Sequence, residues 1–109
     1  MFAVLTTDVH PYIISMMQYR IDFNEEKNLL LQEARGIGFE EVIEAIGKGN
    51  IVADFRHKNR KMYPNQRILA VRINQYIYAI PYILDTKKGV IFLKTVYPSR
   101  ALTKKYLKK

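Results

Sequence analysis

The strongest constraint on the fold is a pair of β-strand patterns joined by a two-residue turn in the second half of the chain. In residues 67–74, the apolar residues Leu69, Val71 and Ile73 occupy every second position, which is the spacing of one face of a sheet. The run 76–84 that follows is rich in β-branched and aromatic residues, and the Asn-Gln pair before it suits a tight turn. These segments therefore predict an antiparallel hairpin.

Further strand and turn patterns flank this hairpin. Pro81 interrupts its second strand and, because proline has no N–H, predicts a bulge or an unpaired stretch at that point. Pro98 is expected to end the sheet. The remaining predicted segments are a strand at 50–55, a polar loop at 56–66, a turn at 85–89 and a strand at 90–97.

Two short helices are predicted before the strands. Asn24 is a good N-cap, and the segment 25–35 is rich in helix formers and ends at Gly36. A second helix follows at once and is ended by Gly47 and Gly49. Its apolar residues recur at i, i+3, i+4 and i+7, namely Phe39, Val42, Ile43 and Ile46.

The C-terminal segment completes the predicted fold. Ser99 is positioned to cap a short basic helix at 100–107. The order of elements predicts an α+β domain in which the two N-terminal helices pack on one face of an antiparallel sheet meander, with a short C-terminal helix. We expect one domain over 17–109 and an N-terminal extension over 1–16, which is either an early start or extra edge strand, or a targeting or interaction arm.

Charge divides the chain into two halves. Residues 1–49 carry four Lys or Arg and eight Asp or Glu, a net charge of −4, whereas residues 50–109 carry fourteen and two, a net charge of +12. A basic half of this size favours a polyanion as partner. The acidic residues on the outer side of the second helix are expected to face solvent or a protein partner; they are Glu40, Glu41 and Glu44.

Composition excludes several classes of site. The chain has no cysteine, so a disulfide scaffold and a Cys-ligated zinc site are excluded, and a cytoplasmic location is expected. No apolar run approaches the roughly 20 residues that span a bilayer. Gly36 and Gly38 join two helices and form no phosphate loop. His10 and His57 lie in different contexts, so neither a metal site nor a Ser-His-Asp triad is expected.

Cationic residues gather toward the C-terminus. Arg100 comes just after the last predicted strand, and Lys94 lies within that strand. Arg67 is the first residue of another strand of the same predicted sheet. A guanidinium suits phosphate because its planar fork matches two oxygens and keeps its charge. Each cation could instead solvate the sheet surface. We take phosphate binding as the hypothesis for Lys94 and Arg100, with Ser99 and Lys104 beside them.

Aromatic residues are interleaved with these cations. Most of the tyrosines in the basic half suit ordinary strand positions, but Tyr97 and Tyr106 lie beside cations and are candidates for stacking on unpaired bases. His57 and Lys61, in the polar loop, are further candidates for contact with phosphate. The predicted RNA-contacting residues are therefore Tyr97, Ser99, Lys104, Tyr106, His57 and Lys61.

Three segments resemble the BrnT-type toxins. The segments are Phe23-Asn24-Glu25-Glu26-Lys27, Arg35-Gly36-Ile37-Gly38-Phe39-Glu40-Glu41 and Pro98-Ser99-Arg100-Ala101-Leu102-Thr103, and the similarity runs from about residue 21 to residue 107. The resemblance implies a RelE-like fold and a toxin of a type II toxin–antitoxin pair. It also implies metal-independent cleavage of RNA, inhibition of translation and a ribbon-helix-helix antitoxin as partner. Lys27, Arg67 and Arg100 match basic positions of that family.

The hypothesis that follows is cleavage of RNA by its own 2′-hydroxyl, a reaction that needs a base, an acid and cations around the phosphorane. We assign Arg67 and Arg100 to the phosphorane charge, and Lys27 or Lys94 to proton transfer. The nuclease hypothesis in this form requires that Arg67 and Arg100 converge on one pocket, and it fails if they point to opposite sides. The alternative is a nucleic-acid-binding or antitoxin-binding module without catalysis, which phosphate-binding cations explain equally well. A small-molecule enzyme has no motif behind it.

Overall fold

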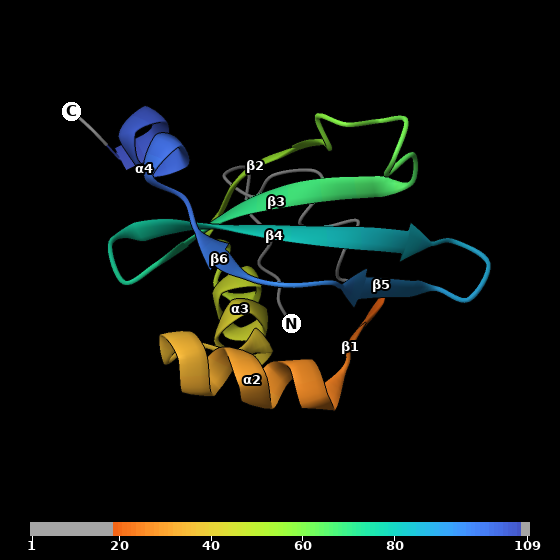
Figure 1. Cartoon of the computed structure of the whole chain (residues 1–109), viewed down its shortest axis with the longest axis horizontal. Coiled ribbons are helices and arrows are strands. Elements are labelled where there is room, and N and C mark those ends of the chain that lie inside the picture. Colours follow the sequence, from red (N-terminus) through yellow and green to blue (C-terminus); the bar gives the residue numbers. More distant parts are fainter. Residues whose placement is uncertain (1–18, 108–109) are drawn as a thin grey trace.

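The computed structural model describes residues 19–107, so the predicted extension over 1–16 lies outside the described residues. The elements lie in a mixed order of helices and strands (Figure 1). In chain order they are β1 (Arg20–Phe23), α2 (Glu25–Arg35), α3 (Phe39–Gly47), β2 (Ile51–Arg56), β3 (Gln66–Ile73), β4 (Tyr76–Asp85), β5 (Val90–Leu93), β6 (Tyr97–Pro98) and α4 (Arg100–Leu107).

The strands form one sheet with the order β1-β5-β4-β3-β2, and β6 pairs with β4. The predicted meander is confirmed, because β2, β3, β4 and β5 pair antiparallel in sequence order. Asn74 and Gln75 form the hairpin turn, and both have positive φ values, 54° and 71°. The sheet is mixed, however, because β1 pairs parallel with β5, from Arg20 beside Val90 onward. The sequence pattern did not predict a strand at this position.

The strand β4 continues through Pro81, where a bulge or an unpaired stretch was predicted. Pro81 pairs in regular register with Ile68 of β3, so the bulge is absent. Its carbonyl faces the opposite neighbour, where it accepts a hydrogen bond from Lys94 N at 2.8 Å. That neighbour changes from β5 to β6 beside Pro81, so the missing N–H removes no ladder bond. The strand predicted at 90–97 is accordingly divided between β5 and the start of β6.

The junction between α2 and α3 depends on local capping. Asn24 Oδ1 accepts a hydrogen bond from Lys27 N at 2.9 Å, and Gly36 ends α2 with a φ of 69°. The buried side chain of Asn28 accepts a hydrogen bond from Phe39 N at 2.7 Å, so α2 caps the first turn of α3. A Cβ on Gly38 would overlap Asn28 Oδ1, so only glycine permits this close approach.

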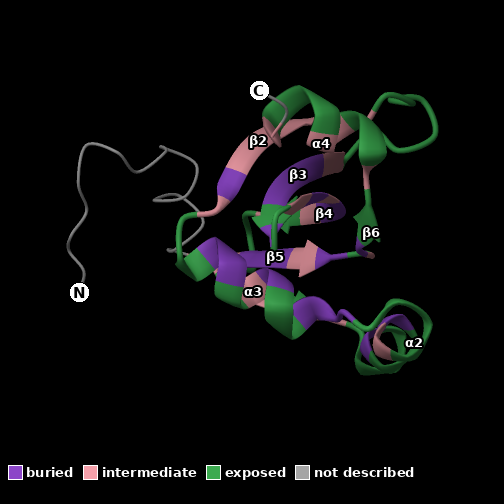
Figure 2. Cartoon of the chain, turned by 90° about the vertical axis from the view of Figure 1, so that its left-hand side faces the viewer, coloured by how far each residue is buried: buried purple, intermediate pink, exposed green. Residues whose placement is uncertain are grey.

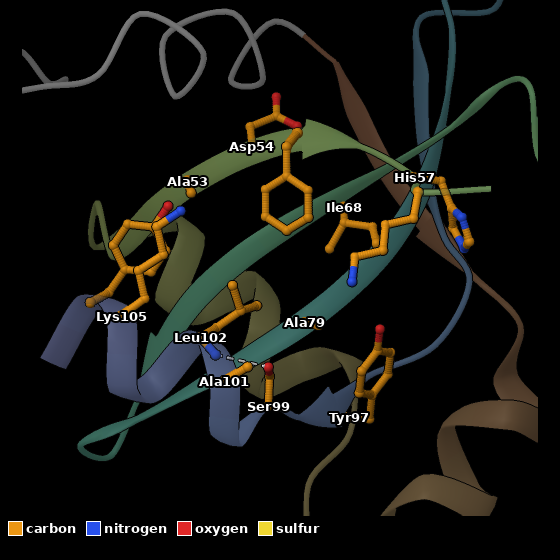
Figure 3. A pocket seen from close by; sticks show the side chains of 13 residues that line it. Ala53, Asp54, His57, Ile68, Ala79, Tyr97, Ser99, Ala101, Leu102 and Lys105 are labelled. Atoms are coloured by element: carbon orange, nitrogen blue, oxygen red, sulfur yellow. Dashed lines mark hydrogen bonds between the residues drawn. The ribbon is translucent and has the colours of Figure 1, made fainter. Parts of the chain in front are cut away.

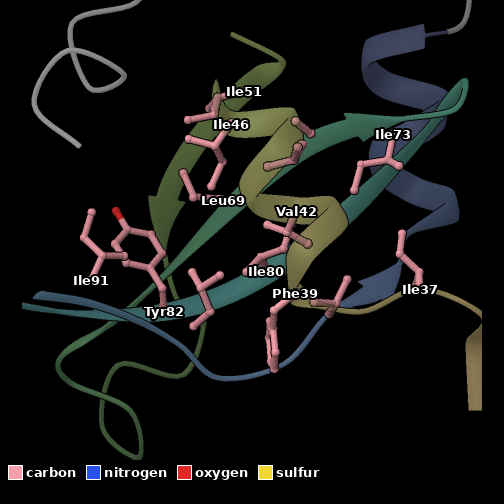
Figure 4. Close-up of a cluster of buried hydrophobic side chains, with 14 of the residues drawn as sticks. Ile37, Phe39, Val42, Ile46, Ile51, Leu69, Ile73, Ile80, Tyr82 and Ile91 are labelled. Carbon is pink, nitrogen blue, oxygen red and sulfur yellow. The ribbon is translucent and has the colours of Figure 1, made fainter. Parts of the chain in front are cut away.

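The predicted packing of both N-terminal helices on the sheet is only partly matched, because α3 packs on the sheet whereas α2 lies beyond α3, away from it (Figure 1). Figure 2 shows α3 on one side of the strands and α4 on the other. The main core lies on the α3 side, where Phe39 and Val42 pack against residues such as Leu69, Ile80 and Tyr82 (Figure 4). We call this side the core face and the other side, against which α4 lies, the α4 face.

Hydrogen bonds hold α4 against the strand β4. Ser99 Oγ accepts from Leu102 N at 3.1 Å, which confirms the predicted cap. Ser99 N donates to Ile77 O at 2.9 Å, and Thr103 Oγ1 accepts from Ile77 N at the same distance. These contacts fix the start of α4 to the sheet, so the side chains of the helix have defined positions above the α4 face.

Candidate functional site

A cleft of about 560 Å³ lies between α4 and the sheet. Its floor is formed by small and apolar side chains of the α4 face, including Ala53, Ile68 and Ala79 (Figure 3). Phe55 of β2 and Leu102 of α4 complete the apolar part. Ligand-binding clefts in proteins commonly have volumes of about 300–1,000 Å³, so this one has room for a small ligand or part of a polymer.

Polar side chains stand around this apolar floor. Lys105 and Tyr106 come from α4, Tyr97 comes from β6, and His57 and Lys58 follow β2. Tyr97 and Tyr106 are each 37% exposed, so one side of each ring is free for a ligand. The Nζ of Lys105 lies 5.4 Å from the centre of the Tyr106 ring, within the range of a cation–π contact. The rim therefore combines positive charge with aromatic surface.

No carboxylate side chain points into the cleft from the described residues. The acidic residues of the basic half are Asp54 and Asp85. Asp54 borders the cleft, but its carboxylate points away from the floor (Figure 3). Asp85 lies at the end of β4, where Oδ1 accepts a hydrogen bond from Lys88 N at 3.0 Å. The cleft therefore presents cations without a nearby anion to neutralise them.

Asp54 instead belongs to a polar cluster with Arg67 and Tyr82. Its Oδ1 accepts from Arg67 Nε at 3.1 Å and from Tyr82 Oη at 3.0 Å. Burial and the charge of Asp54 raise the pKa of Tyr82 well above its usual range. Burial lowers the pKa of Arg67, but the charge and hydrogen bond of Asp54 outweigh that effect, so the net change is upward. The cluster is an ion pair of the core face, in which the Asp54 carboxylate is largely buried and the Arg67 side chain is partly exposed.

Arg67 and Arg100 do not converge, and the predicted pairing on one phosphate is wrong. Arg67 pairs with Tyr82, which belongs to the core face, whereas Arg100 lines a separate hollow with Gln75 and Tyr76 at the hairpin turn. Along β3, six residues at about 3.3 Å each separate Arg67 from the turn end by about 20 Å. The two residues therefore differ in both face and end of the sheet.

The other predicted catalytic residues are also dispersed. Lys27 lies on the first turn of α2 and is not among the residues that line the cleft. The Nζ of Lys94 lies 5.5 Å from the centre of the Phe92 ring. Phe92 pairs with Ile83, one residue from Tyr82 on β4, so it belongs to the α4 face. Lys94 is therefore on the correct face but outside the cleft lining.

The predicted RNA-contacting residues divide into two groups. Tyr97, Ser99, Tyr106 and His57 line the cleft. Lys104 lies with Arg100 in the hollow at the hairpin turn, and Lys61 lies in the exposed loop between β2 and β3. The structure thus brings together the aromatic candidates and not the arginines.

His57 is held by three contacts at the end of the cleft. Its backbone N–H donates to Gln66 O at 3.2 Å, and its Nδ1 accepts from Asn59 N at 3.1 Å. Its ring lies 4.5 Å from that of Tyr63, centre to centre. Because Nδ1 accepts a hydrogen bond, Nε2 carries the proton in the neutral imidazole. His57 is therefore positioned as a hydrogen-bond donor.

Sequence reasoning did not single out Lys58, Lys105 or Phe55. A signal for Lys105 was present, since Ala101 and Lys105 lie four residues apart and Leu102 and Tyr106 do the same. Residues with that spacing share a helix face. Lys104, the predicted residue, lies one position away and about 100° around the helix.

No protein-family model matches the chain, and no curated protein matches it. Among solved structures, a double arginine-to-alanine mutant of the E. coli toxin RelE in the free state is similar, with a TM-score of 0.43 and 23% sequence identity. The match covers 78% of this chain and 87% of that chain. A similarity of this size does not establish a family.

Within residues 19–107, no helix is long and apolar enough to cross a membrane. The same part of the chain holds no group of three or more His, Asp or Glu side chains that could bind a metal ion.

Proposed function

We propose that the cleft on the α4 face binds RNA, and that the protein cleaves this RNA without a metal as the toxin of a type II toxin–antitoxin pair. The observation that carries the RNA-binding part is the composition of the cleft: cations and partly exposed tyrosines around an apolar floor, toward which no carboxylate of residues 19–107 is turned. Lysines bind phosphates without regard to sequence, and tyrosines stack on bases. The toxin class rests on the sequence resemblance over residues 21–107.

The proposed reaction is attack of the 2′-hydroxyl on the adjacent phosphorus atom. A P–O bond forms to the 2′-oxygen as its proton passes to solvent water, and the bond to the 5′-oxygen breaks as that oxygen takes up a proton from solvent, which leaves a 2′,3′-cyclic phosphate and a free 5′-hydroxyl. Lys58 and Lys105 are the cleft cations that would stabilise the charge of the phosphorane. His57 would donate a hydrogen bond to a phosphate oxygen, and Tyr97 and Tyr106 would hold the flanking bases.

These roles replace those that the sequence pattern favoured for Arg67 and Arg100. Arg67 is occupied by Asp54, and Arg100 faces the hairpin turn, where it suits a contact with the RNA backbone beyond the cleft. Lys94 is retained as a candidate because it lies on the α4 face. A ribbon-helix-helix antitoxin and inhibition of translation remain part of the proposal through the resemblance alone.

The experiment uses a labelled single-stranded RNA in a buffer with EDTA. We expect shortened products with cyclic phosphate ends, and no cleavage of DNA of the same sequence, since DNA lacks the 2′-hydroxyl. Lys58→Ala with Lys105→Ala should reduce cleavage strongly, whereas the control Lys48→Ala, at an exposed position just after α3, should cleave like the wild type. Induced expression should arrest growth only for the variants that cleave.

A second candidate function is RNA binding without catalysis. The separation of Arg67 from Arg100 favours it, because these two arginines are not placed to hold one phosphate together. In the same experiment, RNA that is retarded in a gel but keeps its length would establish this function. RNA that is neither retarded nor shortened would contradict both candidates.

A further inference from the structure

The outer face of α2 has a composition that the cleft does not explain. Leu29 and Leu30 are 60% and 61% exposed, although they stand side by side in a well-formed helix. Helices of globular proteins normally turn such residues toward the core. Within the described part of the chain, these two adjacent exposed leucines therefore form an apolar surface without a partner.

The opposite side of α2 holds the helix to the rest of the molecule. Asn28 and Leu31 are buried, and Arg35 donates from its guanidinium to Val96 O at 2.6 Å. In Figure 1, α2 lies beyond α3, away from the sheet. Because one side of α2 makes these contacts, the leucines stay exposed without strain on the fold.

Acidic residues flank the exposed leucines. Glu26, Leu29, Leu30 and Glu33 follow the spacing i, i+3, i+4 and i+7, which places them on one stripe of the helix, and all four are exposed. Glu40 at the start of α3 extends the charge, since its Oε1 accepts from Gln32 Nε2 at 3.3 Å. We call these five residues the acidic leucine surface: Glu26, Leu29, Leu30, Glu33 and Glu40.

Charge decides which partner fits this surface. RNA and an anionic lipid surface are repelled by three carboxylates. A second copy that used the same surface would bring its Glu26 and Glu33 close to those of the first copy, and the like charges would repel each other. The basic helix α4 of a second copy is unsuited, since its leucines are already placed against its own sheet, Leu102 at the cleft and Leu107 at the hollow beside the hairpin turn. What remains is a different protein with an apolar stripe between basic side chains.

We propose that the acidic leucine surface binds an amphipathic, lysine- or arginine-rich helix of a partner protein. Leucines of such a helix would cover Leu29 and Leu30, and its cations would pair with Glu26 and Glu33, in the helix-to-helix mode of recognition. This inference goes beyond the proposed RNA activity, because α2 contributes no residue to the cleft. If the chain is a toxin, this is the surface at which we place the antitoxin.

The test uses the full chain and two synthetic helical peptides that differ in one respect. Both carry leucines at i, i+3, i+4 and i+7, flanked in one by lysines and in the other by glutamates. Fluorescence polarisation should show binding of the lysine peptide and at least tenfold weaker binding of the glutamate peptide. Equal binding of both peptides, or no binding of the lysine peptide, would overturn the proposal.

Variants locate the binding. Leu29→Ser with Leu30→Ser should weaken the lysine peptide at least tenfold, whereas Met62→Ser, at an equally exposed position in the loop between β2 and β3, should not. Glu26→Lys with Glu33→Lys should reverse the preference between the two peptides. Circular dichroism checks that each variant is folded. Unchanged affinity in the leucine variant would refute this location, and RNA binding measured on the same samples reports separately on the cleft.

Discussion

The two faces of the sheet use the same strands for different purposes. On the core face, α3 covers the strands and the side chains between them are buried. On the α4 face, a short helix covers only part of the sheet and leaves a cleft with a cationic rim. Neighbouring residues of a strand point to opposite faces of the sheet. Arg67 therefore forms an ion pair with Asp54 on the core face, while Ile68 forms part of the floor of the cleft. Position along the chain is therefore a poor guide to function here.

The difference separates stability from binding. Core-face residues have closed surroundings, so their removal leaves a cavity, whereas cleft residues are partly in contact with solvent. Variants on the core face should lower the free energy of unfolding and spare RNA affinity in the protein that stays folded. Variants on the α4 face should lower RNA affinity and change the free energy of unfolding less.

The largest expected effect is that of Phe39→Ala on the core face. Phe39 is fully buried and stacks on Phe23 with ring centres 4.9 Å apart, so we expect a loss of about 3–5 kcal/mol in the free energy of unfolding. Phe55→Ala removes the same ring from the wall of the cleft and should cost less than half as much. Urea denaturation measures both. Equal costs would show that the cleft is as closed as the core.

A smaller effect is expected for Arg67→Ala. The carboxylate of Asp54 would lose one partner and keep Tyr82, so unfolding should become easier by about 1–2 kcal/mol. RNA affinity should change little, because the guanidinium faces away from the cleft. A loss of RNA binding as large as that of the double variant of Lys58 and Lys105 would return Arg67 to the binding site.

The raised pKa of Tyr82 should make the free energy of unfolding depend on pH in the alkaline range. Because its pKa is raised in the folded protein, Tyr82 loses its proton first in the unfolded chain, near the ordinary value of 10.0. The contribution to stability is therefore complete below that pH and declines as the pH rises above it. Unfolding followed from about pH 8 to pH 11 should show this decline, and Tyr82→Phe should reduce it. A decline of the same size in both proteins would assign it to other groups.

The smallest change in stability is expected for Lys105→Ala. Its side chain is on the surface, so the free energy of unfolding should stay within about 0.5 kcal/mol of the wild type. RNA affinity should fall, and the dependence of log K on log salt should flatten by about one unit. Lys48→Ala, the control at the end of α3, should leave the salt dependence as it is. A similar flattening in both variants would indicate non-specific attraction.

Local signals predicted the helices and most of the strands. The cap at Asn24 and the end of α2 at Gly36 involve residues within a few positions of each other, and the hairpin turn is equally local. The strand β1 was missed because its four residues are stabilised by a distant parallel neighbour, β5. The face covered by α4 likewise depends on a distant contact, that of Thr103 with Ile77.

The sequence predicted what type of site the candidate site is, but not which cations lie together in it. The charge of the basic half and the tyrosines at 97 and 106 indicated a nucleic-acid site, and both tyrosines line the cleft. The prediction that Arg67 and Arg100 share one phosphate was wrong. The alternation of side chains along a strand places Arg67 on one face of the sheet but does not tell which helix covers that face. Asp54, which occupies Arg67, lies thirteen residues away on another strand.

Binding of RNA in the cleft is tested most directly by a photochemical crosslink between the protein and a thiouridine-containing single-stranded RNA, mapped by mass spectrometry. We expect the crosslinked peptides to contain Tyr97 and Tyr106, the tyrosines of the cleft, and Tyr19 and the other aromatic residues of the core face to remain unmodified. Crosslinks concentrated on the core face or on α2, with Tyr97 and Tyr106 unmodified, would contradict it.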